Sequence, residues 1–397
     1  MRSDEVGRRP EGRTAMIVVV GAGIAGTAAA LAAARRGAPV TLVDGGPGAT
    51  ALGSGALDGD ATLDDDARAI LDELALVDLV PGIALTTSGA LRRVVGGDRA
   101  LLRLSAGASV FVPESSHPRW RGARLATVWA DSALAHDASL SFSSTKVSLL
   151  SGDAERAMGD VELAALFDDE ARIESLGARL RAALPPGTTH VALPPWLGCE
   201  RARAAALSAI VGVTCGEVLG DPAGPAGERF VHARDAALAK AGVKIVRSTV
   251  KSTDGRAVTL DDGSVLRANA VVLAIGGVAG GGIHYSPSAA IASTALPPHP
   301  RASFTLSVDA PLALGHHGRP ILVPGSMFGI AAEDVALPLG GDVLLDRIGV
   351  LPSGAPPALF VAGDVVADRP RHWLEALRSG VAAGAAAHQA AFALGAP

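Results

Sequence analysis

The sequence is poor in aromatic residues and in cysteine. Aromatic side chains make up 3% of the 397 residues, and the two cysteines are Cys199 and Cys215. Two cysteines are too few for a disulfide framework, and they lack the clustered spacing that holds an iron–sulfur cluster. We therefore expect both thiols to be buried packing residues in a reduced, cytoplasmic protein.

The chain also lacks the charge and motif patterns of several protein classes. Its formal net charge is −5, and it has no basic run that could follow a nucleic-acid backbone, so no nucleic-acid partner is expected. A zinc signature, a phosphate-loop lysine and a nucleophile-elbow motif are missing as well. The adjacent His316 and His317 have no cysteine or acidic partner at ligand spacing, and we expect no metal site.

Small apolar residues are abundant instead, and the segment 16–26 (MIVVVGAGIAG) arranges them in a recognisable order. Its valines and isoleucine predict a buried strand, followed by a glycine turn and a helix. Gly21 permits the tight turn, Gly23 lets a pyrophosphate approach the backbone, and Gly26 lets the helix pack closely on the strand. The segment therefore predicts a dinucleotide site.

An acidic residue follows this turn where a dinucleotide site needs one. Asp44 ends the next predicted strand, 39–43, and a carboxylate about 20 residues on accepts a ribose hydroxyl. The alternative is that Asp44 only caps the following turn. The apolar stretch 16–34 is also about as long as a membrane span, but it is rich in glycine and alanine and has no aromatic belt. We expect no transmembrane segment.

A second hydrophobic strand ends in two glycines. The segments 257–260 and 265–267 predict a hairpin that runs directly into a strand at 270–277, which ends at Gly276 and Gly277. Glycines at this point indicate that something approaches the backbone closely. Ligands of open α/β sheets bind at the carboxyl ends of the strands.

The last predicted strand, at 358–366, contains Gly363 and Asp364. A helix predicted at 373–394 follows it, with Gly380 and a second glycine four residues on along one face. Small residues at this spacing let a helix lie close to a ligand or a strand. The shorter predicted elements are strands at 110–112, 125–128, 146–150 and 189–193, and helices at 61–79, 160–184, 199–210 and 229–241.

These landmarks, in this order, resemble the flavoprotein superfamily with two dinucleotide-binding domains. The resemblance implies that the first turn holds the adenosine and pyrophosphate of FAD, and that Asp364 bonds the ribityl or pyrophosphate part. It also implies that the last helix aims its N-terminal dipole at the pyrimidine end of the flavin. The expected fold is α/β, with a Rossmann-like FAD-binding parallel sheet built from discontinuous segments and a second, inserted α/β lobe.

The expected domains follow from this resemblance. They are an extension at 1–15, expected to be disordered, FAD-binding segments at 16–84, 225–282 and 351–397, an inserted second lobe at 85–224, and an excursion of that lobe at 283–350.

Within the superfamily the chain resembles one component of the anaerobic glycerol-3-phosphate dehydrogenase, the flavin subunit that works beside the substrate-oxidising one. The resemblance lies at 51–58 (ALGSGALD), 193–198 (LPPWLG), 216–217 (GE), 227–230 (GERF), 274–277 (AIGG) with the glycine run 280–282, and 359–364 (LFVAGD). It implies a flavin, described as FMN in that family, and partner subunits that carry FAD and iron–sulfur clusters. It also implies peripheral membrane association through those partners. The chain departs from the family at Asp364 and is short between 341 and 357. Asp44 favours FAD, because FMN has no adenosine ribose, and FMN stays open.

Four residues are the candidates nearest the chemistry. We expect Ser54 and Gly55 to pass near the isoalloxazine and offer donors to its N5, although the segment also fits an ordinary flexible loop. His284 and Tyr285 follow a glycine run after the second flavin strand and are expected to move a proton during hydride transfer. Their alternative is a hydrogen-bonded surface or hinge pair.

The expected function is a flavin-dependent oxidoreductase that passes electrons from a small organic substrate or a partner flavin subunit towards a quinone-linked chain. The alternatives are a stand-alone FAD-dependent dehydrogenase or reductase of the fumarate-reductase-like group, and a flavin-bearing scaffold subunit of an electron-transfer complex. Arg229, His232, Arg371 and His372 either neutralise an anionic substrate or the flavin phosphates, or form a solvated surface.

Overall fold

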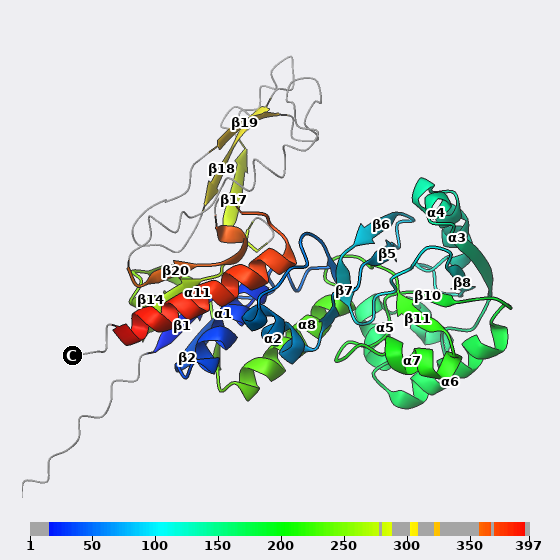
Figure 1. Cartoon of the computed structure of the whole chain (residues 1–397), viewed down its shortest axis with the longest axis horizontal. Helices are drawn as coiled ribbons and strands as arrows, with labels where there is room; N and C mark the ends of the chain where they lie inside the picture. The colour runs from blue at the N-terminus through cyan, green and yellow to red at the C-terminus, as the bar shows by residue number, and fades with distance from the viewer. Residues whose placement is uncertain are drawn as a thin grey trace, which may run out of the picture. The chain divides into compact units, whose positions relative to one another are not determined.

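The computed structural model describes residues 16–277, 280–287, 302–308, 321–325, 357–366 and 369–393. The described residues form two compact units (Figure 1). Unit 1 takes those within Met1–Gly46, Leu238–Arg369 and Ser379–Pro397, and unit 2 takes those within Pro47–Ala237 and Pro370–Arg378.

Unit 1 is built on a five-stranded parallel sheet in the order β12-β2-β1-β16-β20. Its strands are β1 (Ile17–Val20), β2 (Val40–Asp44), β12 (Lys244–Arg247), β16 (Ala270–Leu273) and β20 (Leu359–Val361). All residues of β1 and β16 are buried, as expected for strands covered on both faces. The sheet draws on three separate stretches of the chain, which confirms the predicted fold class.

Two helices of unit 1 pack against each other through small residues. They are α1 (Ile24–Arg35) and the part of α11 (Trp373–Ala393) that begins at Ser379. A Cβ added at Gly380 would lie 2.2 Å from the carbonyl oxygen of Ala25, and one at Gly384 would lie 2.3 Å from that of Ala29. The close neighbour of the predicted glycine face is therefore a helix, where the sequence led us to expect a ligand or a strand.

Unit 1 also contains two antiparallel sheets. The first joins β13 (Val250–Thr253), β14 (Ala257–Leu260) and β15 (Val265–Arg267), and it contains the predicted hairpin with the predicted bounds. The second joins β17 (Ile283–Pro287), β18 (Ala302–Val308) and β19 (Ile321–Gly325). The contacts of these last strands assign them to unit 1, whereas the prediction gave 283–350 to the second lobe. His316 and His317 lie outside the described residues.

Unit 2 has a four-stranded parallel sheet in the order β11-β10-β8-β9. Its strands are β8 (Ser109–Glu114), β9 (Ser141–Lys146), β10 (His190–Leu193) and β11 (Thr214–Glu217). Its helices are α2 (Asp65–Leu74), α3 (Gly122–Ala130), α4 (Ala133–Asp137), α5 (Asp160–Leu166), α6 (Glu170–Ala183), α7 (Ala204–Val211) and most of α8 (Pro225–Lys240), with a short 3-10 helix at η1 (Asp153–Ala157). Trp120, Trp129 and Phe167 are fully buried in its core.

The short strands of unit 2 explain where its boundary falls. β3 (Ala56–Leu57) and β4 (Val77–Asp78) both pair with β7 (Gly96–Asp98), and β5 (Gly82–Leu85) pairs with β6 (Leu91–Val94). Residues from 47 onwards therefore fold with unit 2, whereas the prediction kept 16–84 in the FAD-binding domain. The start of α8, up to Ala237, also belongs to unit 2 and not to the segment 225–282.

One predicted strand of unit 2 is a helix. Residues 125–128 lie inside α3, where the buried residues Leu125, Ala126 and Trp129 share one helical face. The strand predicted at 146–150 was also misplaced. The observed strand is β9, whose pairing with β8 ends at Glu114 and Lys146, so it lies almost entirely before the predicted segment.

Two predicted helices begin later than expected at acidic N-caps, and a third begins after a loop. Asp64 accepts a hydrogen bond from Ala67 N at 2.7 Å, so the helix predicted at 61–79 begins only after this residue, as α2. Asp169 caps α6 in the same way and divides the helix predicted at 160–184. The helix predicted at 199–210 begins only at Ala204, as α7, and the N–H groups of Cys199 and Glu200 in the preceding loop donate to Asp168.

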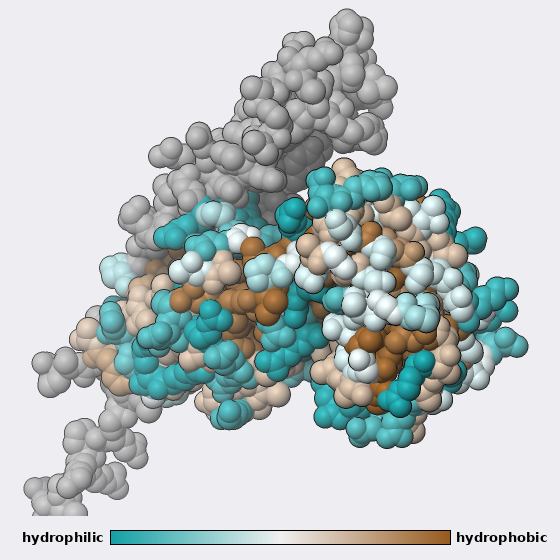
Figure 2. Space-filling view, turned by 45° about the vertical axis from the view of Figure 1, so that its right-hand side comes forward, coloured by the Kyte–Doolittle hydropathy of each residue, from teal (hydrophilic) through white to brown (hydrophobic). Residues whose placement is uncertain are grey.

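Among the described residues no helix is long and apolar enough to span a membrane. The apolar stretch at 16–34 divides into β1 and α1 at the glycine turn. In Figure 2 hydrophilic residues lie along much of the visible outline, and hydrophobic residues gather in places towards the middle of the face. The exposed large hydrophobic side chains of the described residues are Met16, Val80, Val128, Val265 and Phe392.

Candidate flavin-binding site

The turn after β1 brings three backbone segments of unit 1 into close contact. Gly21 has a φ of +106°, and its N–H donates to Val43 O at 2.9 Å. A Cβ on Gly21 would lie 2.2 Å from Ala274 O, and one on Gly26 would lie 1.8 Å from Gly21 O. Only glycine fits either position, because no side chain can occupy the space between β1, β16 and α1.

The N-terminus of α1 suits an anion. Gly23 is the N-cap residue, in extended conformation, and no side chain among the described residues caps this end of the helix. The first turn carries no acidic residue that would repel a phosphate. Thr27 Oγ1 donates to Gly23 O at 2.9 Å, and this bond stabilises the first turn of α1. The sequence analysis did not identify this role of Thr27. The one signal for it is its place one turn into the predicted helix, where a threonine can bond to the carbonyl of the glycine turn.

Asp44 stands at the carboxyl end of β2, next to β1. Its Oδ1 accepts the N–H of Gly46 at 3.1 Å, so the carboxylate does cap the following turn. This bond alone does not exclude a ribose hydroxyl, because a carboxylate has about four acceptor sites. The two roles considered for Asp44 are therefore compatible.

The carboxyl end of β16 is a crowded glycine turn. Gly276 has a φ of +79°, and Gly277 O accepts the N–H of Gly282 at 3.0 Å. A Cβ on Gly282 would lie 2.1 Å from Gly276 O. The glycine run that follows the strand thus folds back on it, with bare backbone at the sheet edge.

The carboxyl end of β20 is held by the sheet and by α11. The N–H of Ala362 donates to Leu273 O at 2.9 Å, and that of Gly363 donates to Ser379 Oγ at 2.8 Å. Gly363 has a φ of +75° and begins the 3-10 turn η3 (Gly363–Val365), where Asp364 is half-buried. Backbone and side chain thus fix this turn at the same sheet edge.

The carboxyl-end edge of one parallel sheet therefore gathers most of the predicted cofactor residues. They are Gly21, Gly23, Asp44, Gly276, Gly277, Gly363 and Asp364, with Gly26 and Gly380 in the adjoining helices. This edge is where open α/β sheets bind elongated ligands. Its glycine turns, and a helix start that no side chain of the described residues caps, suit a pyrophosphate. His284 and Tyr285 lie in β17, opposite Ser307 and Leu306 of β18.

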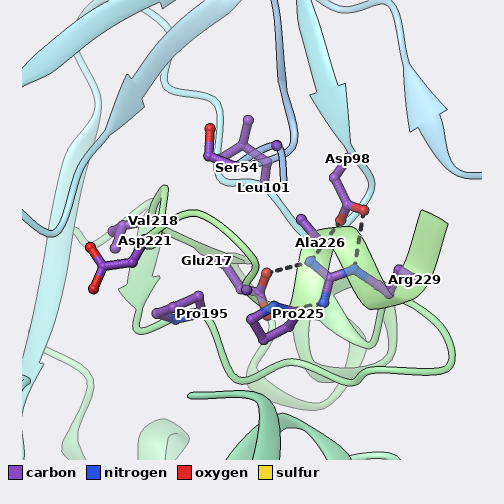
Figure 3. Close-up of a pocket in the computed structure, with 13 residues that line it drawn as sticks. Ser54, Asp98, Leu101, Pro195, Glu217, Val218, Asp221, Pro225, Ala226 and Arg229 are labelled. Carbon is purple, nitrogen blue, oxygen red and sulfur yellow. Dashed lines mark hydrogen bonds and ion pairs between the residues drawn. The ribbon is translucent and has the colours of Figure 1, made fainter. Parts of the chain in front are cut away.

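Ser54 and Gly55 belong to unit 2, in the loop before β3. Gly55 has a φ of +88°, and its carbonyl oxygen accepts the N–H of Asp98 at 2.7 Å. Ser54 and its neighbours line a small cavity of about 10 Å³, which is room for one water molecule (Figure 3). The cavity is bounded by Gly53, Ser54, Asp98, Leu101, Pro195, Glu217, Val218, Gly220, Asp221, Gly224, Pro225, Ala226 and Arg229.

A buried ion cluster forms one wall of this cavity. Arg229 contacts Asp98 through two nitrogens, at 3.0 and 3.1 Å, and donates to Glu217 Oε2 at 2.7 Å (Figure 3). All three side chains are at least 95% buried. Burial raises the pKa of Glu217 against the opposing effect of Arg229.

The buried cluster corrects the prediction for Arg229. Its guanidinium is neither on a solvated surface nor open to flavin phosphates, because it donates to two carboxylates and to Gly198 O. The sequence offered no signal for Asp98 of β7, and Glu217 of β11 was noted only as part of the family resemblance, without a role. The buried Phe230 beside Arg229 was the one hint that this side chain lies inside.

The other predicted cations and the cysteines have ordinary structural places. His232 is exposed, and His372 is half-buried and accepts the N–H of Glu375 at 3.2 Å through Nδ1, at the start of α11. Arg371 is half-buried. Both cysteines are buried, and burial raises the pKa of each thiol to about 12. The described residues contain no group of three or more His, Cys, Asp or Glu placed to hold a metal ion.

Comparison with known proteins agrees with this site. A family model described as an FAD binding domain matches residues 16–94. None of the curated proteins matches the chain.

Several solved structures are similar over nearly the whole chain. An iminodiacetate oxidase from Chelativorans sp. BNC1 has 15% identity and a TM-score of 0.31, with 96% of each chain covered. A glycine oxidase from Bacillus cereus has 10% identity and a TM-score of 0.30, with 96% of this chain and 95% of that chain covered. A glycine oxidase from Geobacillus kaustophilus has 13% identity and a TM-score of 0.29, with 95% of each covered.

The fold and the family match define an FAD-binding domain on a Rossmann-like sheet. The match at residues 16–94 indicates FAD as the cofactor.

Proposed function

We propose that this flavoprotein passes electrons from a small organic substrate, or from a partner flavin subunit, towards a quinone-linked chain. The proposal follows the resemblance to the flavin subunit of the anaerobic glycerol-3-phosphate dehydrogenase, with glycerol 3-phosphate as the first substrate to test. It includes partner subunits that carry FAD and iron–sulfur clusters, peripheral membrane association through them, and a cytoplasmic location.

The observation that carries the proposal is the glycine-lined edge of the unit 1 sheet. The glycine turns at Gly21, Gly276 and Gly363 lie at this edge, and no side chain of the described residues caps the N-terminus of α1. This arrangement supports the binding of a long cofactor with a charged middle. When bound, FAD supplies the two-electron chemistry. The chain supplies binding and orientation, with the N-terminus of α1 at the pyrophosphate and Asp44 at the adenosine ribose.

The remaining predicted residues receive roles as part of the same proposal. Asp364 bonds the ribityl or pyrophosphate part, and Ser54 and Gly55 offer donors to the ring system. His284 and Tyr285 hold or move a proton of the substrate. A histidine suits this role because its ordinary pKa lies near neutral pH.

Purified protein tests the proposal directly. The released cofactor is identified by mass, and the flavin spectrum is followed without oxygen as glycerol 3-phosphate is added, and then a quinone analogue. Bleaching by glycerol 3-phosphate followed by recovery with quinone would support the proposed reaction and rule out a role as scaffold alone. Protein that stays colourless after reconstitution with FAD would refute every redox role.

A pair of variants tests the pyrophosphate site itself. Gly23 has a φ of −68°, which any residue can adopt, so Gly23→Val places bulk at the proposed phosphate position without backbone strain. We expect it to lose its flavin. Gly48→Val is the matched control, because a Cβ there meets nothing within 4 Å. Full flavin retention by Gly23→Val would contradict the assignment.

A further inference from the structure

Hydrogen bonds to three acceptors fix the turn at the carboxyl end of β20. The N–H of Ala362 donates to Leu273 O at 2.9 Å and is the last bond of the strand to the sheet. Gly363 then turns the chain with a φ of +75°, and the N–H of Val366 closes η3 on Gly363 O at 2.9 Å. Because the chain leaves the sheet at Gly363, the N–H of this residue needs an acceptor elsewhere. Ser379 Oγ is that acceptor, at 2.8 Å.

The helix that carries Ser379 sets the position of its hydroxyl. α11 lies along α1 (Figure 1), and the next residue holds the two helices close, since a Cβ on Gly380 would lie 2.2 Å from Ala25 O. The turn η3 itself also contacts α1. The bond from Gly363 to Ser379 therefore ties η3 to a helix pair whose member α1 begins at the proposed pyrophosphate site. All of these residues belong to unit 1.

Helix propensity indicates that this serine is present for its hydroxyl. From Ser379 onwards α11 is rich in alanine, which forms helices better than serine does. A serine inside a helix tends to compete with the backbone bonds of its own helix, whereas this oxygen accepts an N–H of another element. Alanine would suit the helix at this half-buried position, but it would remove the acceptor of the Gly363 N–H.

We propose that Ser379 is a positioning residue for FAD, because it holds the turn Gly363–Val365 in place relative to the N-terminus of α1. The inference rests on the proposed function, which assigns the pyrophosphate to that helix start and gives Asp364 a bond to the ribityl or pyrophosphate part. Two sites that bind one long cofactor must keep their spacing, and a short side chain between packed elements fixes such a spacing well. Ser379 acts through the backbone of Gly363 and not by contact with the cofactor.

Three variants test the inference. Ser379→Ala removes the hydroxyl, and Ser379→Thr keeps it. Ser208→Ala is the matched control in unit 2, where the hydroxyl of another half-buried helix serine accepts the N–H of Cys215 in β11, also at 2.8 Å. Circular dichroism and thermal unfolding establish that each variant is folded. Hydrogen–deuterium exchange of the segment 359–366, FAD affinity, the flavin absorption spectrum and the reduction potential are then compared with wild type.

We expect Ser379→Ala to speed exchange in this segment about tenfold in protein without FAD, because the Gly363 N–H loses its acceptor. The same variant should raise the dissociation constant of FAD about 3- to 10-fold and shift the flavin absorption band and the reduction potential. Ser379→Thr should stay close to wild type. Ser208→Ala should lose a similar amount of thermal stability and leave both the exchange at 359–366 and the flavin properties unchanged.

Unchanged exchange at 359–366 in a folded Ser379→Ala protein would overturn the inference. Faster exchange with unchanged affinity, spectrum and potential would also overturn it, since the turn would then not position the cofactor. Flavin changes of the same size in Ser208→Ala would assign the effect to general stability and do the same. A wild-type protein that takes up no flavin would refute the proposed function, whereas a wild type that binds flavin, beside an unaffected Ser379→Ala, refutes the inference alone.

Discussion

Replacing Gly26 by alanine should damage the nucleotide end of unit 1 out of proportion to the size of the change. The new Cβ would lie 1.8 Å from Gly21 O, whereas ordinary contact begins at 3.4 Å, so α1 or the turn has to move by about 1.6 Å. Alanine gains about 1 kcal/mol over glycine from helix propensity. Overpacking of this kind costs about 1–3 kcal/mol, occasionally more. We therefore expect a net loss of up to about 2 kcal/mol in the free energy of unfolding.

The effect on FAD should be larger than the effect on stability. The displaced element is the helix start that we assign to the pyrophosphate, and each hydrogen bond to a charged group contributes about 1.5–3 kcal/mol. Loss of one such bond raises the dissociation constant of FAD about 10- to 100-fold.

Gly37→Ala provides the matched control at the opposite end of α1. Gly37 has a φ of +88° and open space around its Cβ position, so alanine there costs roughly 1–2 kcal/mol of backbone strain and leaves the nucleotide end untouched. The two variants should lose similar stability, but only Gly26→Ala should lose FAD affinity.

The choice of assay matters, because all four tryptophans lie in unit 2. Tryptophan fluorescence would report on that unit, so urea unfolding is followed by far-ultraviolet circular dichroism, and FAD binding by flavin fluorescence. A Gly26→Ala protein that binds FAD within about twofold of wild type would refute the close-packing argument.

Three further predictions concern other parts of the described structure. Gly380→Ala and, separately, Gly384→Ala should each lower the melting temperature measured by circular dichroism, because each new Cβ meets a carbonyl oxygen of α1 at 2.2 or 2.3 Å; melting as in wild type would contradict the packing of α11 on α1. Asp44→Asn should weaken FAD binding about tenfold in a fluorescence titration, and an unchanged affinity would mean that the carboxylate only caps its turn. Burial raises the pKa of the Cys199 and Cys215 thiols to about 12. Both should therefore react with a disulfide reagent at pH 8 about 1,000-fold more slowly than free cysteine. Fast labelling of the native protein would show that a thiol is accessible.

The unit 1 sheet could be predicted because its signals are local. Runs of valine between glycine turns define β1 and β16, and the turn at 261–264 defines the hairpin between β14 and β15. Each of these patterns is complete within about ten residues, so no distant contact is needed to interpret it.

The errors arose where distant contacts decide the structure. The short, mostly apolar stretch at 125–128 fits a strand as well as a helix, and the packing of Trp129 in the core of unit 2 favours α3. The boundary after Gly46 depends on two-residue strands that pair with β7, which are too short to leave a pattern. The cluster of Asp98, Glu217 and Arg229 joins residues that are 131 and 12 positions apart, so spacing could not reveal it.

The three-segment sheet of unit 1 imposes an order on synthesis. β1 and β2 leave the ribosome early, but β16, which pairs with β1, comes more than 200 residues later, and the edge strand β20 beside β16 follows about 320 residues after them. Synthesis up to β20 takes roughly 15–65 s at bacterial and eukaryotic translation rates. Unit 2 is nearly continuous in the chain and can complete most of its core during this interval. The valine-rich β1 meanwhile has only β2 beside it, because its second partner, β16, comes later. Premature termination shortly before β20 would leave a folded unit 2 attached to an unfinished unit 1.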